Sequence, residues 1–369
     1  MKRLVSLTLA LLIALIALLP AEAEETITRR MGVLSMMNVT EADVDNYVKG
    51  RTLIGVQLRR EGSQTNEYYQ SPEEGQSGEN ADRPSLNLEV VYFDTLDAML
   101  MALNAGEIAA MDVSETTAQY LTHSDPNLVQ VASYGDGADG DTFADIVRRG
   151  LLSNDFAFMF LEANAALRDE FDAALAAITD EEMEKLIQAH IAAAINGEAI
   201  DPIQMPVIEG AETIRVAVTG ALPPMDYVAA DGSPAGFNTA LLAEISNRIG
   251  RNIELVVVDS MGRAAALASG TVDAVFWTRT NAESNRIAAC SEEERARKRE
   301  EDSKNLSADE IETMKTVEAL VDLIDYGRAD MPEGTVITAP YFSDIIVPVT
   351  TRAWLDKAAA RTNNWLRRV

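Results

Sequence analysis

Cysteine and histidine are scarce in this chain of 369 residues. The single cysteine, Cys290, cannot form an internal disulfide, so packing must stabilise the fold. The two histidines, His123 and His190, lie far apart in the sequence, which gives a zinc site little support. The sequence also lacks a G-x-S-x-G elbow, a P-loop and a G-x-G-x-x-G motif. We therefore expect no metal and no cofactor.

Basic residues are few, 31 against 59 acidic residues, which gives a formal net charge of -28. A surface with this charge repels nucleic acid and anionic lipid. Adaptation to high salt and simple solubility are both adequate explanations of the excess acid. We expect a monomer that binds no nucleic acid.

The N-terminal 23 residues combine a short basic start with an apolar run over residues 4–19 and the pattern Ala-Glu-Ala at residues 21–23. This arrangement is typical of a secretory signal peptide with cleavage before Glu24. An uncleaved membrane anchor is the alternative, because the run approaches spanning length. No cysteine follows the run, so we expect no N-terminal lipid anchor. The sequence predicts a periplasmic or extracellular protein.

Two segments of the sequence repeat each other. Residues 90–111 (VVYFDTLDAMLMALNAGEIAAM) and 255–276 (LVVVDSMGRAAALASGTVDAVF) each contain an apolar run, an acidic residue, a helical pattern, a glycine and a second apolar run. Each segment predicts a β-α-β unit, in which Gly106 and Gly270 end the helices. The repeat therefore indicates an α/β protein with two lobes of similar plan.

The first predicted lobe covers residues 24–200. A buried strand is expected at residues 53–58, and a long amphipathic helical region at residues 167–191 closes the lobe. Residues 201–211 form a predicted linker, because prolines and glycines gather in and around them.

The second predicted lobe covers residues 212–369. It begins with the strand TIRVAVTG at residues 213–220, and a helix is expected at residues 239–249. Residues 291–326 form a charged helical insertion, in which Ser307 caps a helix. A solvated surface insertion and a partner-binding arm both explain this segment.

Three motifs of the second lobe resemble a known family. Residues 214–250 (IRVAVTGALPPMDYVAADGSPAGFNTALLAEISNRIG), 266–286 (ALASGTVDAVFWTRTNAESNR) and 337–350 (ITAPYFSDIIVPVT) follow in the order of the family's N-terminal lobe. The family is that of the extracellular amino-acid-binding proteins of ABC transporters, which have the type II periplasmic solute-binding fold. The resemblance covers most of residues 212–352.

The first lobe is similar to what the family places afterwards. Residues 48–69 (VKGRTLIGVQLRREGSQTNEYY) resemble the opening of the family's C-terminal lobe, and residues 161–191 resemble its terminal helices. The resemblance thus implies a two-lobed fold with the lobes in permuted order, with one sheet in each lobe and the hinge near residues 155–160 and 345–350. Two degraded binding domains in tandem are the alternative.

The resemblance also implies a ligand carboxylate bound by arginine and by hydroxyl groups. Arg286 takes the position of the family's arginine if one residue is inserted after Thr280, and Arg279 competes with it. A surface ion pair is the alternative role for either arginine, and a plain helix cap is the alternative for the turn at residues 63–65. The predicted carboxylate ligands are Arg286, Arg279, Thr278 and Thr280, with Ser63, Gln64 and Thr65 from the other lobe.

The ligand's ammonium group is where the sequence departs from the family. Thr219 and Ser114 stand at the positions of the family's acidic residues, and neither carries a charge. Asp226 and Glu115, displaced from these positions, can replace the missing acids or can be ordinary exposed charges.

The aromatic surface for the ligand is altered as well. Leu222 and Met225 stand at positions that are usually aromatic, and Met225 suits a core-packing role better than ligand stacking. Trp277 and Tyr227 are the candidates to restore an aromatic surface.

The function that the resemblance implies is that of a solute receptor, not an enzyme, that captures an amino acid or related small polar ligand for an ABC transporter permease. An enzyme like the periplasmic dehydratases of the same fold is one alternative, although no catalytic pair stands out. A ligand-less sensor or interaction module, with the helix at residues 307–324 as its docking surface, is the other.

Overall fold

A computed structural model describes residues 27–35, 86–130, 153–229, 231–259, 262–280 and 333–357, together with the single positions 297, 304, 307, 308 and 311. The chain divides into two compact units, one of residues Met1–Arg29 and Arg51–Glu89, and one of Arg30–Gly50 and Val90–Val369. Almost all described residues belong to the second unit. The predicted signal peptide, the strand at residues 53–58 and nearly all of the charged insertion lie outside the described residues.

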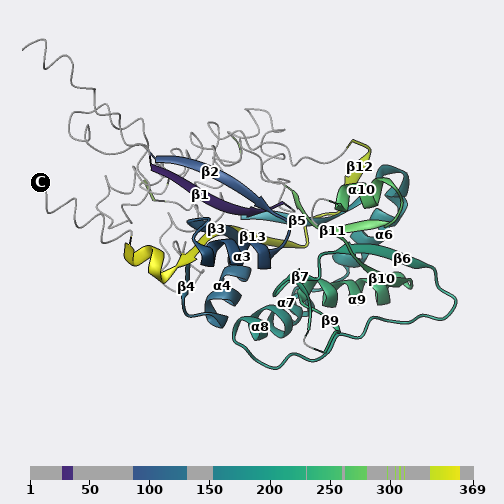
Figure 1. The fold of residues 1–369 in the computed structure, drawn as a ribbon. Helices are drawn as coiled ribbons and strands as arrows, with labels where there is room; N and C mark the ends of the chain where they lie inside the picture. Colours follow the sequence, from purple (N-terminus) through teal and green to yellow (C-terminus); the bar gives the residue numbers. More distant parts are fainter. Residues whose placement is uncertain are drawn as a thin grey trace, which may run out of the picture. The chain divides into compact units, whose positions relative to one another are not determined.

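The fold is mixed α/β, built on a ten-stranded sheet whose main path runs β10-β6-β11-β5-β13-β3-β1-β2 (Figure 1). Two further strands join this sheet, β12 beside β5 and β4 beside β13. The strands along the path are β10 (Asn252–Val257), β6 (Thr213–Val218), β11 (Ala274–Thr280), β5 (Ser153–Leu161), β13 (Phe342–Thr351), β3 (Ala110–Ser114), β1 (Ile27–Leu34) and β2 (Leu86–Phe93), and the two others are β12 (Thr335–Ile337) and β4 (Leu128–Gln130). A small second sheet contains β7 (Ala221–Leu222), β8 (Asp226–Val228) and β9 (Pro234–Ala235).

Both predicted β-α-β repeats form. In the first, β2 leads into α3 (Leu96–Ala105) and then into β3. In the second, β10 leads into α10 (Arg263–Ala268) and then into β11. Gly106 and Gly270 follow the two helices with φ of 74° and 71°, in the left-handed region where glycine has no steric cost. The predicted glycine stops are therefore confirmed.

The two repeats are joined through β5 and β13. Residues 342–345 of β13 pair antiparallel with β5, and residues 346–349 pair antiparallel with β3. On its other side β5 pairs antiparallel with β11. We expected one sheet for each repeat, whereas the described strands form one continuous path, because β13 changes its partner halfway along its length.

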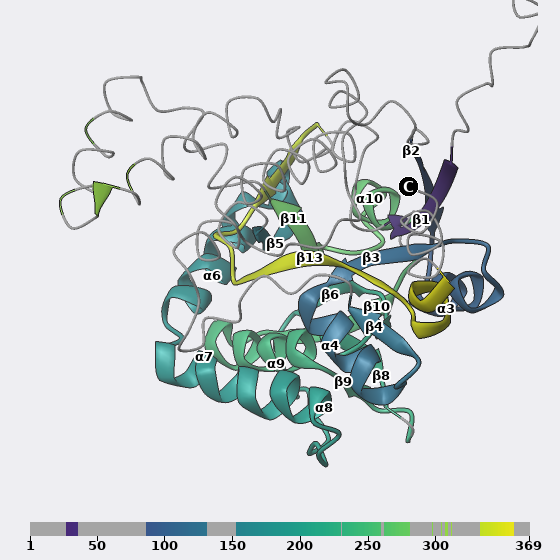
Figure 2. The same ribbon diagram turned by 90° about the vertical axis from the view of Figure 1, so that its left-hand side faces the viewer.

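The helices pack along this path of strands, as the two views in Figures 1 and 2 show. α9 (Phe237–Ile249) follows β9 and packs against α6 (Ala165–Ala176) and α7 (Asp180–Ile187). α4 (Glu115–Ser124) follows β3 and packs against α8 (Ala193–Ile195). Thus β5 and α6, which the sequence boundaries assign to the first lobe, contact elements of the second.

The helical region predicted at residues 167–191 is interrupted. After a 3-10 turn at Glu162–Asn164, α6 ends at Ala176 and α7 begins after Thr179. Thr179 and Glu182 form a capping box, in which each side chain accepts a hydrogen bond from the other's backbone N–H. α7 then continues through a π-helical turn at Gln188–Ala192 into α8. The interruption was readable in the sequence, because Thr-Asp-Glu-Glu is a helix-start signal.

The variant Thr179→Ala is expected to lower the free energy of unfolding by about 1 kcal/mol, the usual effect of losing an N-cap side chain. Thr122→Ala is the matched control, because Thr122 lies within α4 and its hydroxyl donates to the Ala118 carbonyl at 2.9 Å. Urea unfolding followed by circular dichroism measures both. An equal fall in the free energy of unfolding in the two variants would show that the N-cap side chain of Thr179 does not stabilise α7.

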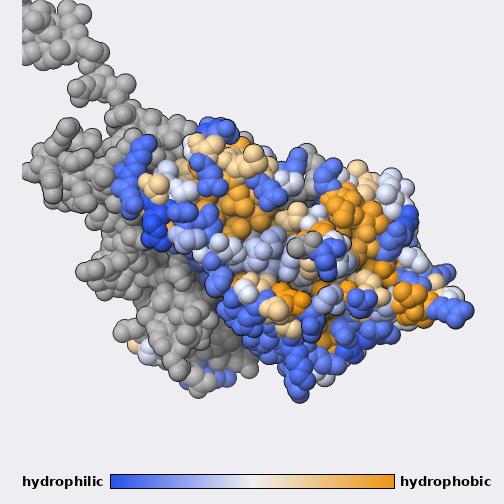
Figure 3. Space-filling view, turned by 60° about the horizontal axis from the view of Figure 1, so that its bottom comes forward, coloured by the Kyte–Doolittle hydropathy of each residue, from blue (hydrophilic) through white to orange (hydrophobic). Residues whose placement is uncertain are grey.

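One core cluster runs through both repeats and is rich in aromatic side chains. Phe158 stacks on Tyr341 with ring centroids 4.6 Å apart, and Phe171 contacts Phe158 and Phe160 edge-on. On the face shown in Figure 3, hydrophilic side chains surround smaller hydrophobic areas. No helix among the described residues is long and apolar enough to cross a membrane.

Candidate ligand-binding site

The loop between β6 and β8 is organised around Asp226. Its Oδ2 atom accepts hydrogen bonds from Thr219 N at 2.6 Å, Thr219 Oγ1 at 2.7 Å and Gly220 N at 2.8 Å. The side chain is buried, and burial raises the pKa of Asp226 while these hydrogen bonds oppose that shift. The Asp226 carboxylate therefore lies beside Thr219, which stands at the position of an acidic residue in the family that the sequence resembles.

The start of α9 fixes the rest of this loop. The N–H groups of Phe237 and Asn238 donate to the carbonyls of Pro224 at 3.1 Å and Met225 at 2.8 Å. Gly236 makes this approach possible, because its φ is 102° and a Cβ atom there would lie 2.5 Å from the Met225 carbonyl oxygen. The first donors of α9 are thus used by the loop itself.

Trp277 lies at an irregular point of β11. Its φ of 52° is in the left-handed region, and the pairing of β11 with β5 shifts register between Val275 and Thr278. The indole stacks on Phe156 with ring centroids 3.7 Å apart and planes 7° apart. Its backbone N–H donates to the Tyr341 hydroxyl at 3.1 Å. Backbone and ring are therefore both held by neighbouring strands.

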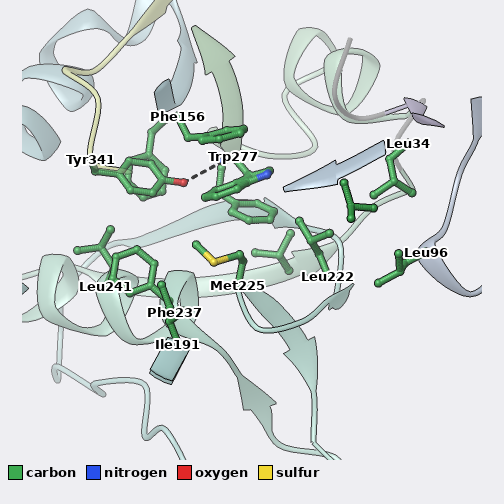
Figure 4. Packing of buried hydrophobic residues seen from close by; sticks show 14 of the residues in the cluster. Leu34, Leu96, Phe156, Ile191, Leu222, Met225, Phe237, Leu241, Trp277 and Tyr341 are labelled. Atoms are coloured by element: carbon green, nitrogen blue, oxygen red, sulfur yellow. Dashed lines mark hydrogen bonds between the residues drawn. The ribbon is translucent and has the colours of Figure 1, made fainter. Parts of the chain in front are cut away.

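Figure 4 shows Trp277 between Phe156 on one side and the loop side chains Met225 and Leu222 on the other. Met225 and Leu222 are buried members of the main core, which agrees with the packing role that the sequence indicated for Met225. Tyr227, the other aromatic candidate, lies on β8 and is half-buried, and burial raises its pKa.

A second polar group lies where β3 ends and α4 begins. Ser114 Oγ donates to Thr117 Oγ1 at 3.0 Å. Asp344 on β13 accepts from Thr116 N at 3.3 Å and from Thr116 Oγ1 at 2.7 Å. Glu115 is buried here and accepts from Gln130 Nε2 at 3.5 Å. Asp344 therefore brings a further carboxylate close to the position of Ser114.

One hydrogen bond connects the two polar groups. Thr117 Oγ1 donates to the Pro223 carbonyl at 3.1 Å, so the start of α4 touches the loop that carries Asp226. This contact brings the segment of Ser114 and Glu115, from the first predicted lobe, next to the loop of Thr219, Met225 and Asp226, from the second.

The other predicted residues have different positions. Thr278 and Thr280 are buried within β11, opposite Ala157 and Asp155 of β5. Arg279 is half-buried on the same strand and donates from Nη1 to Asn154 Oδ1 at 3.4 Å. The predicted residues Ser63, Gln64, Thr65 and Arg286 lie outside the described residues.

Sequence reasoning missed Asp344, Arg263 and Tyr341. Asp344 is one acidic residue inside an apolar strand, and Arg263 is the one cation of an alanine-rich helix. Each is buried, which is unusual for a charged side chain and is a signal of function or of a specific partner. The sequence signal was thus a lone charge in an apolar segment.

The buried Asp344 is expected to make the free energy of unfolding fall as the pH rises from about 4 to about 6. Burial raises the pKa of Asp344 from 3.8 to about 6, so the folded state keeps the proton after the unfolded state has lost it. The stabilisation is present below about pH 4 and is lost as the pH passes 6, and it is on the order of 2–3 kcal/mol at about 1.4 kcal/mol per pKa unit. Urea unfolding across this pH range should show a smaller fall in the free energy of unfolding for Asp344→Asn than for the wild type.

Asp231→Asn is the control for this experiment. Asp231 is exposed, and hydrogen bonds from Ser233 lower its pKa, so its contribution has the opposite sign. In Asp231→Asn the free energy of unfolding should still fall between about pH 4 and pH 6. If this fall is equally steep in the wild type and in Asp344→Asn, Asp344 is not its cause.

Residues 214–292 match the family of bacterial extracellular solute-binding proteins, family 3. This segment contains β6, the Asp226 loop, α9, β10, α10 and β11. The match confirms the resemblance of this part of the chain to solute-binding proteins. No curated protein sequence matches the chain.

Solved structures with a distant similarity include two binding proteins and a lipoprotein. The zinc-bound ligand-binding component of an ABC-type import system from Staphylococcus aureus is 12% identical, over 90% of this chain and 69% of that one, with a TM-score of 0.36. The periplasmic aliphatic sulphonate-binding protein of Escherichia coli is 11% identical, over 94% and 71%, with a TM-score of 0.30. Lipoprotein Tp32 of Treponema pallidum is 10% identical, over 94% and 90%, with a TM-score of 0.32.

Proposed function

We propose that the chain is a solute-binding receptor that captures a small polar molecule for an ABC transporter, and that it is not an enzyme. The match of residues 214–292 to solute-binding proteins supports this function. The observation that carries it is the hydrogen bond from Thr117 Oγ1 to the Pro223 carbonyl, because it joins the segment that carries Ser114 and Glu115 to the loop that carries Asp226. A binding site made by two lobes requires such a meeting point.

The ligand that we propose is an amino acid. Asp226 places a carboxylate 2.7 Å from Thr219 Oγ1, and Asp344 places another beside Thr116. Anionic groups buried in this way suit the ammonium group of an amino acid, since a buried charge is stable only when it is paired or hydrogen-bonded. Asp226 and Asp344 support this ligand class, because they place acids near Thr219 and Ser114, where the sequence lacks the family's acidic residues.

A thermal-shift scan over the twenty common L-amino acids tests the function. A ligand that binds only the folded state raises the melting temperature in proportion to the logarithm of its concentration. We expect one amino acid or a small related group to raise it, by an amount that keeps growing with the logarithm of the ligand concentration. An unchanged melting temperature with all twenty contradicts the proposal and favours the ligand-less sensor.

We also propose that residues 1–23 are a signal peptide and that the exported protein works as a monomer with a transporter permease. The apolar run before residues 21–23 and the family match of residues 214–292 support export. The N-terminal sequence of the protein recovered from the cell envelope tests this, and a chain that still begins at Met1 contradicts it.

We further propose that the chain is a circular permutant of the solute-binding family, with lobes at residues 24–200 and 212–369 and a linker at 201–211. Two features support it. First, β5 and β13 run antiparallel between the repeats, as connections between two lobes do. Second, α6 packs on α9, although α6 precedes the predicted linker in the sequence and α9 follows it.

A rearranged chain tests the permutation. Residues 201–369 are placed first and joined by a flexible Gly/Ser linker to residues 24–200. We expect the same circular dichroism spectrum and a single unfolding transition, because the contacts between the segments are kept. A rearranged chain that shows no cooperative unfolding contradicts the permutation.

A further inference from the structure

The first turn of α4 is capped by a side chain from a distant strand. Ser114, the N-cap residue, makes no side-chain hydrogen bond to the backbone N–H groups of the helix. Instead, Asp344 Oδ2 on β13 accepts from Thr116 N at 3.3 Å and from Thr116 Oγ1 at 2.7 Å. The N-cap residue itself normally supplies this acceptor. Asp344 thus ties the start of α4 to a strand 228 residues further along the chain.

Asp344 also lies at the point where β13 changes its partner. It is opposite Asn154 in the part of β13 that pairs with β5, and the pairing with β3 begins two residues later at Ile346. Its Oδ1 atom accepts from the N–H of Ile345 at 2.8 Å. One carboxylate therefore meets both the start of a helix and the change of strand partner.

A chain of hydroxyl groups leads from Asp344 to the loop between β6 and β8. Ser114 Oγ lies 3.4 Å from Thr116 Oγ1 and donates to Thr117 Oγ1 at 3.0 Å. Thr117 Oγ1 donates in turn to the Pro223 carbonyl at 3.1 Å. A hydroxyl both donates and accepts, and hydrogen bonds in a chain polarise one another. A change of charge on Asp344 therefore acts on the contact with this loop.

The Asp344 carboxylate is buried without a cation. Its residue is 7% exposed, and among the described residues no cation forms an ion pair with it. Burial raises the pKa of Asp344 from 3.8 to about 6, hydrogen bonds from Thr116 and Ile345 oppose this shift, and the charge of Glu115 adds to it. An ionised carboxylate in such a place is costly, and opening of the contact to water relieves the cost.

The groups around Asp344 offer it little positive charge. Arg279 of β11 donates to Asn154, opposite Asp344, and makes no hydrogen bond to Asp344 itself. Among the described titratable groups, Glu115 is the one whose charge acts on the pKa of Asp344. The titratable side chains on the helices and strands packed against β13 are Asp97 of α3, Asp112 of β3, Glu115, Tyr120 and His123 of α4, and Asp155 of β5.

We propose that Asp344 is a pH-sensitive switch for the contact between the start of α4 and the loop of Asp226. Protonated Asp344 stays buried and keeps the contact closed, whereas ionised Asp344 lets it open. The closed state holds the proton more tightly than the open state, in which water surrounds the carboxyl group. The closed contact is therefore most stable below about pH 4 and is weakened as the pH rises through about 6. The switch needs no ligand, so it is independent of the proposed function.

Hydrogen–deuterium exchange followed by mass spectrometry tests the switch on the full chain. Exchange is measured at about pH 5 and about pH 7, corrected for the intrinsic pH dependence, in peptides of α4 and of α9 as the internal reference. We expect the protection of α4 to fall about tenfold, because the opening equilibrium changes tenfold per pH unit until Asp344 ionises and then levels off. The protection of α9 should stay nearly constant.

The midpoint of this change separates a switch from a merely structural role. Asp344→Asn should abolish the change, because an amide does not titrate. Glu115→Gln should move the midpoint to lower pH and Thr116→Val to higher pH, because the charge of the first raises the pKa of Asp344 and the hydroxyl of the second lowers it. Thr122→Val is the matched control, since this hydroxyl donates to the Ala118 carbonyl within α4, and should leave the midpoint unchanged.

Thr117→Val tests the connection to the loop. In the wild type the peptide of residues 219–228 should follow the pH response of α4. In Thr117→Val this peptide should lose the response while α4 keeps it, because the last hydroxyl of the chain is gone. An unaltered loop response in this variant overturns the role of the hydroxyl chain.

Three results overturn the switch itself. They are a protection of α4 that does not change with pH, a change that is the same in Asp344→Asn, and an equal fall in α9, which indicates a loss of global stability. If Asp344→Asn does not fold, Glu115→Gln and Thr116→Val decide, because both keep the Asp344 carboxylate. Midpoints that do not move in opposite directions then overturn the proposal.

Discussion

Replacing Trp277 with alanine is expected to lower the free energy of unfolding by about 3–5 kcal/mol. The indole is 1% exposed, stacks on Phe156 at 3.7 Å and lies 5.8 Å from the Phe342 ring, so alanine leaves a large cavity where three strands meet. Stacked aromatic pairs add about 0.5–1.5 kcal/mol to the burial of their area. Guanidinium unfolding followed by circular dichroism measures the loss.

Trp354→Ala is the matched control for this variant. Trp354 is only partly buried, at the C-terminal end of the described chain, so its loss should cost much less. A Trp277→Ala loss no greater than that of the control contradicts the view that Trp277 holds β5, β11 and β13 together.

Replacing Gly236 with alanine is expected to lower the free energy of unfolding by about 2–4 kcal/mol. A Cβ atom at Gly236 lies 2.5 Å from the Met225 carbonyl oxygen and 2.8 Å from that of Pro224, and these are backbone atoms that cannot rotate away. The φ of 102° adds strain, because side-chain-bearing residues rarely adopt it. The loop must separate from α9, which should also weaken any binding that uses Asp226.

Gly232→Ala separates the two causes. Gly232 has a similar φ of 86°, but a Cβ atom there meets nothing within 4 Å, so only the backbone strain of about 1 kcal/mol remains. Chemical denaturation of both variants measures the difference. If Gly232→Ala costs as much as Gly236→Ala, the close approach of the loop to α9 is not what requires glycine.

The local elements of the fold were predictable from the sequence. The repeated order of apolar run, helical pattern and glycine placed α3 and α10 correctly, because alternation, helical spacing and a left-handed glycine are properties of a few consecutive residues. The continuous sheet was not predictable, because the exchange of partners along β13 depends on segments more than 180 residues apart. No local pattern records such a pairing.

The candidate site was predictable only where a motif defines it. The loop of Thr219 and Asp226 follows from its place after a strand, and the structure brings it to Ser114 through Thr117. The burial of Arg263 was missed, because it depends on what surrounds the side chain in space. The roles of Ser63, Gln64, Thr65 and Arg286 remain predictions.

Native mass spectrometry of the protein with an equimolar pool of the twenty amino acids tests the central claim most directly, namely that this chain is a solute receptor. The account predicts one added mass per chain, equal to that of a single amino acid or of a few related ones. A spectrum that shows only the unliganded mass for the wild type, at every concentration of the pool, contradicts it.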